Sequence, residues 1–261
     1  MNKLLAYALF VAAVFSVPAF CRAQSAFDGT WRIDAAQSKL SPKPNDFYIS
    51  DGWYHCTSCS PVIDVQADGQ DHAVKGEPYD TLSVRVVDPH SIELIAKKDG
   101  KIVYDQTRTV SANGKELTVK TTDHPENSSK PVTSEIVCAR EGVAPSGVQA
   151  TSGKWRIERL NESSNGLTFT DKVSGDELTM TDPTGATYTA KLDGTNAPVK
   201  GAYDFDSVSV KTVNPHTIEE TDKRNGTVVD VARMTVDGNT MRIEETNKIT
   251  DRTDDLVAHK V

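Results

Sequence analysis

One stretch occurs twice in this chain and constrains its fold more than any other feature. Residues 81–93 read TLSVRVVDPHSIE, and residues 207–219 read SVSVKTVNPHTIE. In both copies alternating apolar residues predict a half-buried strand, a Pro-His pair occupies a tight turn, and an isoleucine begins the next strand. The sequence therefore predicts a β-hairpin that has been duplicated.

The similarity between the two halves extends beyond this hairpin. Three further pairs of segments match in the same order: 29–34 with 153–158, 67–76 with 192–201, and 97–103 with 223–229. We therefore expect two domains from a tandem duplication, at residues 24–140 and 153–261. The intervening segment 141–152, EGVAPSGVQATS, has neither helix nor strand periodicity and is rich in small residues, which is typical of a short flexible linker.

Asp-Gly and Asn-Gly turns recur at short intervals in each half, as at Asp99-Gly100 and Asp237-Gly238. These dipeptides suit hairpins because the central turn residues adopt positive φ. The short alternating runs between them predict about eight antiparallel strands per copy and no helix. Such strands form sandwiches or closed barrels, and closure removes the unpaired edges of a meander. The predicted fold class is all-β, with two tandem small antiparallel up-and-down barrels.

The beginning of the chain has the pattern of a secretory signal peptide over residues 1–23. A basic Lys3 precedes an apolar run, and small residues at Cys21 and Ala23 favour cleavage before Gln24. The run is shorter than the about 20 residues of a membrane span, and a lipid anchor at Cys21 is disfavoured because a bulky phenylalanine precedes it. We expect a periplasmic or secreted protein without a membrane span.

The charge balance argues against a nucleic-acid partner. The chain has a formal net charge of −8, and residues 1–23 hold two of the cations and no acid, so the remainder carries −10. Such a surface repels phosphate backbones, and no basic stripe interleaved with aromatic residues occurs. We expect no nucleic-acid partner, and the sequence identifies no other macromolecular partner.

Each copy begins its first strand with a GxW motif, which contains Trp31 or Trp155, and ends its last strand with a cation, Arg140 or Lys260. This pattern resembles the lipocalins and related small barrels. The resemblance implies that each tryptophan plugs one end of a barrel and that a cation from the last strand packs on its face. A cation–π contact of this kind contributes about 0.5–2 kcal/mol.

The resemblance extends to a group of secreted bacterial tandem proteins with lipocalin-like (calycin-like) domains. It covers almost the whole chain after residue 23. The shared segments are YxCxxC at 54–59, ADGxDxxVxG at 67–76, TYTAKLDG at 187–194 and IEETDKRNG at 218–226. The resemblance implies a fold and no biochemical activity.

Three cysteines follow residue 23, at Cys56, Cys59 and Cys138. A thioredoxin-type pair needs a helix N-terminus to lower the thiol pKa, whereas the repeat alignment places the CxxC in a hairpin region. Structural zinc needs four N or S ligands; His55 and either Cys138 or His72 are the further candidates, without a second CxxC or an HxxxH. We favour a local Cys56–Cys59 disulfide, which leaves Cys138 as a buried free thiol or, alternatively, bridged to one of the pair.

Other chemistry has little support in the sequence. His90 and His216 occupy equivalent turns, and type I turn preferences account for both. The GxSxG elbow, the HExxH motif and the P-loop do not occur. No pair among the scattered acids can be nominated as general acid and base. We expect no enzyme activity, no catalytic residue, no metal and no cofactor.

The leading hypothesis is an exported, non-catalytic protein that binds a small apolar or amphipathic ligand inside a barrel. The candidate ligand-binding residues are Phe47, Trp53 and Tyr54 of the first copy and Tyr188 of the second, with Trp53 and Tyr54 near the mouth of the first barrel. Small barrels also fill their interiors with side chains. The alternatives are therefore a structural or protein-interaction module of the cell envelope, and a thiol or metal site at the cysteine pair.

Overall fold

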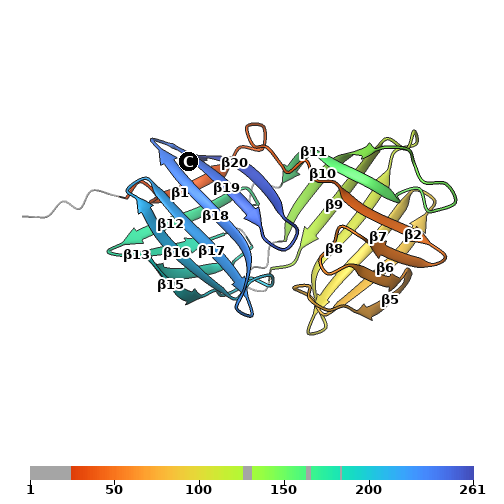
Figure 1. The fold of residues 1–261 in the computed structure, drawn as a ribbon, viewed down its shortest axis with the longest axis horizontal. Helices are drawn as coiled ribbons and strands as arrows, with labels where there is room; N and C mark the ends of the chain where they lie inside the picture. Colours follow the sequence, from red (N-terminus) through yellow and green to blue (C-terminus); the bar gives the residue numbers. More distant parts are fainter. Residues whose placement is uncertain (1–24, 126–130, 163–165, 183) are drawn as a thin grey trace, which may run out of the picture.

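The computed structural model describes residues 25–125, 131–162, 166–182 and 184–261, so the predicted signal peptide lies outside the described residues. Every regular element in these ranges is a β-strand. No helix in the described part of the chain is long and apolar enough to cross a membrane. The strands form two antiparallel sheets of ten, each curled into a nearly closed barrel (Figure 1). The all-β class and the tandem barrels predicted from the sequence are confirmed.

We call the two sheets barrel 1 and barrel 2. Barrel 1, on the right of Figure 1, consists in hydrogen-bonded order of β4 (Ile63–Gln66), β3 (Trp53–Cys56), β2 (Asn45–Ser50), β11 (Gly153–Glu162), β10 (Val132–Glu141), β9 (Glu116–Asp123), β8 (Lys101–Val110), β7 (Ser91–Lys98), β6 (Thr81–Asp88) and β5 (Asp68–Ala73).

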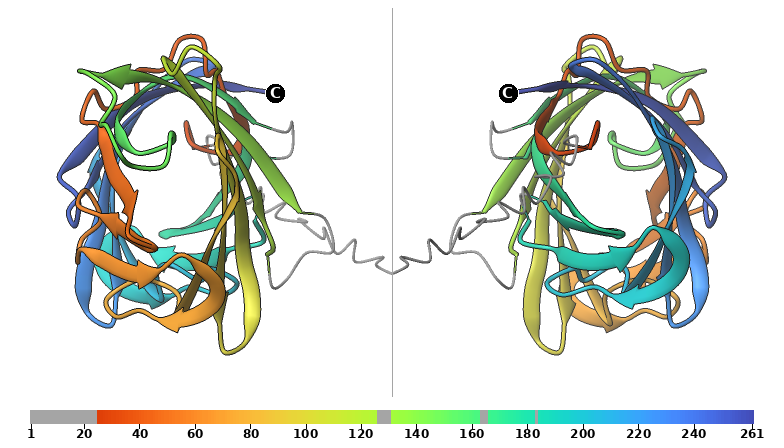
Figure 2. Two further views of the ribbon diagram at one scale, coloured as in Figure 1. Left: turned by 90° about the vertical axis from the view of Figure 1, so that its right-hand side faces the viewer. Right: turned by 90° about the vertical axis from the view of Figure 1, so that its left-hand side faces the viewer.

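Barrel 2 has the same arrangement. Its order is β14 (Thr187–Lys191), β13 (Glu177–Thr181), β12 (Thr168–Ser174), β1 (Gly29–Ile33), β20 (Arg252–Lys260), β19 (Thr240–Asn247), β18 (Thr227–Asp237), β17 (Thr217–Arg224), β16 (Ser207–Asn214) and β15 (Asp193–Pro198). Viewed along the long axis of the molecule, the strands form a ring (Figure 2).

Ten strands per barrel exceed the about eight that the strand-and-turn pattern predicts. In each barrel a single residue, Ala67 or Leu192, separates two short strands at a bend. A glycine with positive φ follows each bend, Gly69 at 79° and Gly194 at 90°. At each bend the chain passes directly from one short strand into the next, so the two are counted separately.

The first strand of each repeat belongs to the barrel of the other repeat. β1 lies between β12 and β20 of barrel 2, with Trp31 opposite Lys260. β11 lies between β2 and β10 of barrel 1, with Trp155 opposite Arg140. The two GxW strands are therefore exchanged between the barrels.

This exchange corrects the domain boundaries expected at 24–140 and 153–261, because each range includes one strand of the other barrel. The segment 141–152 is also not a linker between domains, since it joins the neighbouring strands β10 and β11 of barrel 1. The chain crosses between the barrels after β1 and again after β11. The sequence repeat shows that β1 and β11 are equivalent strands. It does not show which barrel each strand joins, because either strand fits either barrel.

The duplicated hairpin is β6–β7 in barrel 1 and β16–β17 in barrel 2. Its apolar positions point into the barrels, where Val84, Ile92, Val210 and Ile218 are at most 1% exposed. In the turn of barrel 1 the Asp88 side chain accepts a hydrogen bond from the backbone N–H two residues later at 2.7 Å, and the asparagine at the same place in barrel 2 does so at 2.9 Å. The acceptor side chains, not the histidines, hold these turns.

Candidate ligand-binding chamber

A tryptophan and a cation close one end of barrel 1. Trp155 is fully buried, its indole N–H donates to the Thr151 carbonyl at 2.8 Å, and the Arg140 guanidinium carbon lies 4.0 Å from the ring centroid. Gly153 has a φ of +132°, and a Cβ there would lie 2.5 Å from Arg140 Nη1. The glycine of the GxW motif is therefore needed both for the backbone conformation and for the passage of the guanidinium to the indole.

Barrel 2 repeats this arrangement with a lysine. Lys260 Nζ lies 4.8 Å from the ring centroid of Trp31, which is also fully buried and donates to the Phe27 carbonyl at 2.8 Å. A Cβ on Gly29 would lie 3.1 Å from the Lys260 side chain. Because the GxW strands are exchanged, each tryptophan meets the last-strand cation of the other repeat.

Residues 149–152 cover the tryptophan end of barrel 1. Arg140 donates to the carbonyls of Ser152 and Ala150 at 2.6 and 2.8 Å, and Gln149 Nε2 donates to two carbonyls of the β6–β7 turn at 3.2 and 3.1 Å. Thr151 and Ser152 are fully buried. This end of the barrel is closed, so its interior is reached from the end that faces barrel 2.

A cavity of about 430 Å³ lies inside barrel 1 and extends to the rim of barrel 2; we call it the chamber. Its volume lies in the range of about 300–1,000 Å³ that is typical of small-molecule sites. The barrel 1 lining is mostly apolar and includes Phe47, Leu117, Val119, Ile136 and Trp155. The interior of barrel 1 is thus only partly filled by its own side chains.

Among the arginines that line the chamber, Arg108 belongs to barrel 1, whereas Arg224 and Arg252 belong to barrel 2. Arg108 Nε donates to Gln106 Oε1 at 2.6 Å and Arg108 Nη1 to the Tyr54 hydroxyl at 3.1 Å. Its guanidinium carbon lies 4.5 Å from the ring centroid of Phe47 and 5.9 Å from that of Tyr54. Within the described ranges, no carboxylate lies within ion-pair distance of Arg108. The chamber therefore has a positive group among apolar and aromatic walls.

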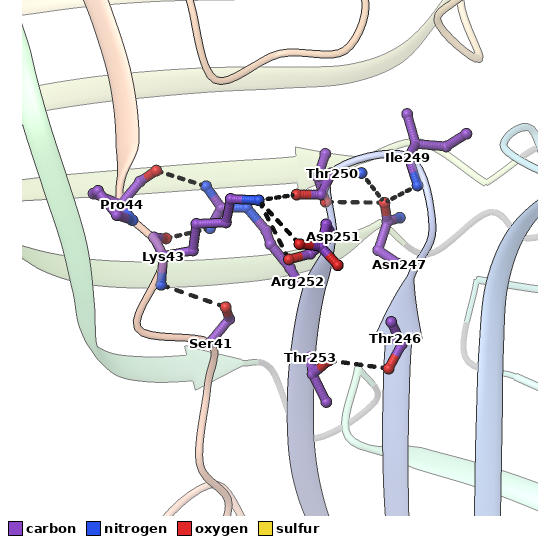
Figure 3. A network of polar contacts seen from close by, with 10 residues as sticks. All are labelled: Ser41, Lys43, Pro44, Thr246, Asn247, Ile249, Thr250, Asp251, Arg252 and Thr253. Carbon is purple, nitrogen blue, oxygen red and sulfur yellow. Dashed lines mark hydrogen bonds and ion pairs between the residues drawn. The ribbon is translucent and has the colours of Figure 1, made fainter.

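The segment that leads into β2 is tied to the β19–β20 turn, and this contact forms one side of the rim (Figure 3). Arg252 donates to the carbonyls of Lys43 and Pro44 at 2.6 and 2.8 Å, and Lys43 Nζ donates to the Thr250 carbonyl at 2.7 Å. Asn247 Oδ1 accepts from the Thr250 backbone N–H at 2.8 Å, which fixes the turn. Asn247, Thr250 and Arg252 all line the chamber.

A second set of contacts joins the barrels on another side of the rim. Arg224 Nη2 donates to the Gly76 carbonyl at 2.9 Å, and Lys98 Nζ donates to the Tyr203 carbonyl at 3.1 Å. The Tyr203 side chain packs against the core of barrel 1. Burial, together with the nearby carboxylate of Asp204, raises the pKa of Asp123 to about 6. The rim of barrel 2 therefore covers the mouth of barrel 1 and holds acids as well as cations.

The interior of barrel 2 differs from that of barrel 1, because it contains carboxyl groups. Glu220 and Asp171 are 5% and 2% exposed, and the Tyr188 hydroxyl donates to Glu220 Oε2. Neither carboxyl oxygen of Asp171 has a hydrogen-bond partner among the described residues, and the same holds for Asp222 Oδ1. Burial raises the pKa of Asp171, Glu220 and Asp222, and it raises that of Glu245 to about 7. These acids are held in an apolar interior that favours their neutral forms.

The candidate ligand-binding residues lie in different places. Phe47 lines the chamber, and Tyr54 is buried beside it. Trp53 begins β3 at the hairpin next to the closed end and is 41% exposed, whereas the sequence placed it near the mouth. Tyr188 is buried inside barrel 2. The structure therefore brings Phe47 and Tyr54 together and separates both from Trp53 and Tyr188.

Sequence reasoning missed Gln106 and Arg108, two polar residues that line the chamber inside barrel 1. Both lie on β8 at alternate positions that share a face with the buried Val110. A comparison of the two repeats could have identified Arg108. In barrel 1 Arg108 lies opposite Ile92, whereas at the equivalent position in barrel 2 Met234 lies opposite Ile218. An arginine in place of an apolar residue on an inward face indicates that the interior of barrel 1 is more polar at this position than that of barrel 2.

Cys56 and Cys59 form a disulfide, and Cys138 is a buried free cysteine, as we favoured from the sequence. Burial raises the pKa of the Cys138 thiol to about 11. Thiol or metal chemistry at the pair would require reduction of the disulfide first. No group of three or more His, Cys, Asp or Glu side chains in the described ranges is placed to hold a metal ion.

No protein-family model, no curated protein and no solved structure matches the chain.

Proposed function

We propose that the protein is an exported, non-catalytic carrier built from two lipocalin-like barrels, and that it holds one small amphipathic molecule in the chamber. The observation that carries this proposal is the cavity of about 430 Å³, whose lining in barrel 1 is mostly apolar and whose rim holds polar and charged residues. Ligand sites in proteins are typically concave and mostly apolar, with a small number of polar groups that orient the ligand.

The difference between the barrels supports one ligand per chain. Barrel 1 has a cavity at its core, whereas the corresponding layer of barrel 2 contains the side chains of Tyr188 and Glu220. Barrel 2 instead supplies the rim residues Asn247, Thr250 and Arg252 that cover the chamber. In this proposal barrel 1 is the container and barrel 2 is its cover.

The export part of the proposal is supported by the predicted signal peptide at residues 1–23 and by the Cys56–Cys59 disulfide. Disulfides persist in oxidising compartments such as the periplasm and the extracellular space. N-terminal sequencing of the protein purified from its native source tests this part. A chain that begins at Gln24 is expected, and a chain that retains residues 1–23 contradicts export by cleavage.

Ligand carriage is tested by two measurements on the purified chain. Mass spectrometry of a solvent extract is expected to identify a co-purified amphipathic compound, and the neutral fluorophore Nile red is expected to bind and to be displaced by that extract. The variant Val119→Trp fills the chamber and should abolish Nile red binding. Lys120→Trp is the matched control, because this neighbouring side chain is on the outer face of β9 and is 68% exposed.

Equal Nile red binding by wild type, Val119→Trp and Lys120→Trp would contradict the chamber as the site. An empty extract together with a protein partner captured by crosslinking would favour the alternative, a structural or protein-interaction module of the envelope.

A further inference from the structure

We propose that the molecule held in the chamber is an organic anion with an apolar body, and that its carboxylate pairs with the guanidinium of Arg108. This inference rests on the proposed function and adds the chemical class of the ligand. It depends on the contacts of one side chain and on what surrounds it.

Arg108 has N–H donors that make no hydrogen bond to the described residues. A guanidinium has five N–H donors, and those of Arg108 that bond to the described residues are Nε, to Gln106, and Nη1, to Tyr54. Nη2 makes no hydrogen bond to any described residue. The free donors lie side by side on the planar group, which is the arrangement that binds a carboxylate through two hydrogen bonds.

The charge of Arg108 also lacks a counter-charge. The guanidinium is partly buried and faces the Phe47 ring, and such a contact compensates only part of the cost of removing a cation from water. The carboxylates that line the chamber, Glu77, Asp204 and Asp230, belong to its rim, and none of them forms an ion pair with Arg108. A bound anion would supply the counter-charge that Arg108 lacks.

The walls beside Arg108 explain the apolar body. Val119 is the cross-strand partner of Arg108, and Ile136 is the next partner along the same row, so the three side chains lie side by side on β8, β9 and β10. Ile249 of barrel 2 lines the chamber from the rim. An anion at Arg108 therefore has apolar surface beside it and towards the mouth.

The fold itself does not need an arginine at this position. Met234 occupies the equivalent place in barrel 2, opposite Ile218, as Arg108 lies opposite Ile92. Arg108→Met therefore gives barrel 1 a side chain that the same architecture already accepts. This substitution separates ligand recognition from folding.

Isothermal titration with decanoate, 1-decanol and decyltrimethylammonium tests the inference on the full chain. Decanoate is expected to bind at least about tenfold more tightly than 1-decanol, since a charge-assisted pair strengthens binding by that order. Decyltrimethylammonium is expected to bind weakest. Arg108→Met should remove the preference for decanoate and leave the affinity for 1-decanol unchanged. Arg85→Met, on an exposed arginine paired with Glu93, is the matched control.

The outcomes separate the two proposals. If decanoate and 1-decanol bind equally to the wild type, or if Arg108→Met retains the preference, the anion inference is overturned and the carrier proposal stands. If none of the three probes binds and Nile red is indifferent to Val119→Trp, both are overturned. Near-ultraviolet circular dichroism of Arg108→Met confirms that barrel 1 is folded, and Arg108→Lys, which keeps the charge without the paired donors, is expected to show an intermediate preference.

Discussion

Replacement of Trp31 by alanine is expected to destabilise barrel 2, although Trp31 lies in the first repeat of the sequence. The indole is fully buried, donates to the Phe27 carbonyl at 2.8 Å and lies under Lys260. Truncation of a buried tryptophan costs about 3–5 kcal/mol. Each 1.4 kcal/mol is a factor of ten, so amide exchange through global opening of barrel 2 should become about two to three and a half powers of ten faster.

Hydrogen exchange with mass spectrometry is the direct assay, because it reports on each strand. In Trp31→Ala, exchange should rise in β16–β20 and change little in β6–β10. Tryptophan fluorescence gives an independent readout, since the remaining Trp53 and Trp155 both belong to barrel 1. In Trp31→Ala, circular dichroism should show that barrel 2 unfolds at a lower denaturant concentration than in the wild type. The fluorescence of Trp53 and Trp155 should not change at this step, because it reports on barrel 1.

The matched variant Trp155→Ala should give the opposite pattern, with faster exchange in β6–β10. The reasoning would be refuted if Trp31→Ala exposed β6–β10 and spared β16–β20, since β1 would then complete the barrel of its own repeat.

Three further predictions concern groups in the two barrels. Barrel 2 should lose stability as the pH rises from about 5 to about 8, because the pKa of Glu245 is raised from 4.5 to about 7, so the folded state holds a proton that the unfolded chain has released. Chemical denaturation midpoints at the two pH values measure this loss of stability. Glu245→Thr, which introduces the residue found at the equivalent position of barrel 1, should reduce the loss. An equal loss in this variant would contradict the assignment of the pH dependence to Glu245. Cys138 should react with the neutral reagent iodoacetamide at pH 8 far more slowly in the native chain than after denaturation, because it is buried and its pKa is raised to about 11; equal rates in the two states would contradict this assignment. Arg140→Met should destabilise barrel 1 by about 2–4 kcal/mol, and Lys260→Met should destabilise barrel 2 by about 1 kcal/mol. The difference is expected because Arg140 donates to three carbonyls, whereas Lys260 donates to one, at 3.4 Å. Equal shifts of the chemical denaturation midpoint in the two variants would argue against these hydrogen bonds as the cause.

Much of the fold could be predicted because the relevant signals are local. The alternation around Val84 and Val210 and the Asp-Gly turns specify strands and hairpins within a few residues, and the repeat shows that the architecture occurs twice. The Cys56–Cys59 disulfide is also local, with a separation of three residues. These features need no knowledge of what the strands contact at long range.

The strand exchange and the chamber could not be predicted in the same way. Trp31 and Trp155 are equivalent, so the pattern around them fits either barrel, and the choice depends on the long-range geometry of the crossings. The chamber is a volume that inward side chains leave unfilled, and alternation identifies inward positions without giving the space between them. Arg108 could have been found by comparison with Met234, but its lack of a carboxylate partner is a property of the assembled barrel.

The exchange of the GxW strands also has a consequence for biosynthesis. All strands of barrel 1 are present once β11 has left the ribosome. By contrast, β1 is synthesised first but pairs with β20, the last strand of the chain. The contacting residues Ala26 and Lys260 are 234 positions apart. Pairing at such separation is slow, and an unpaired strand edge is a template for another chain. Two nascent or partly unfolded molecules could donate β1 to each other, so the architecture that joins the barrels within one chain also provides a route to linked oligomers at high concentration.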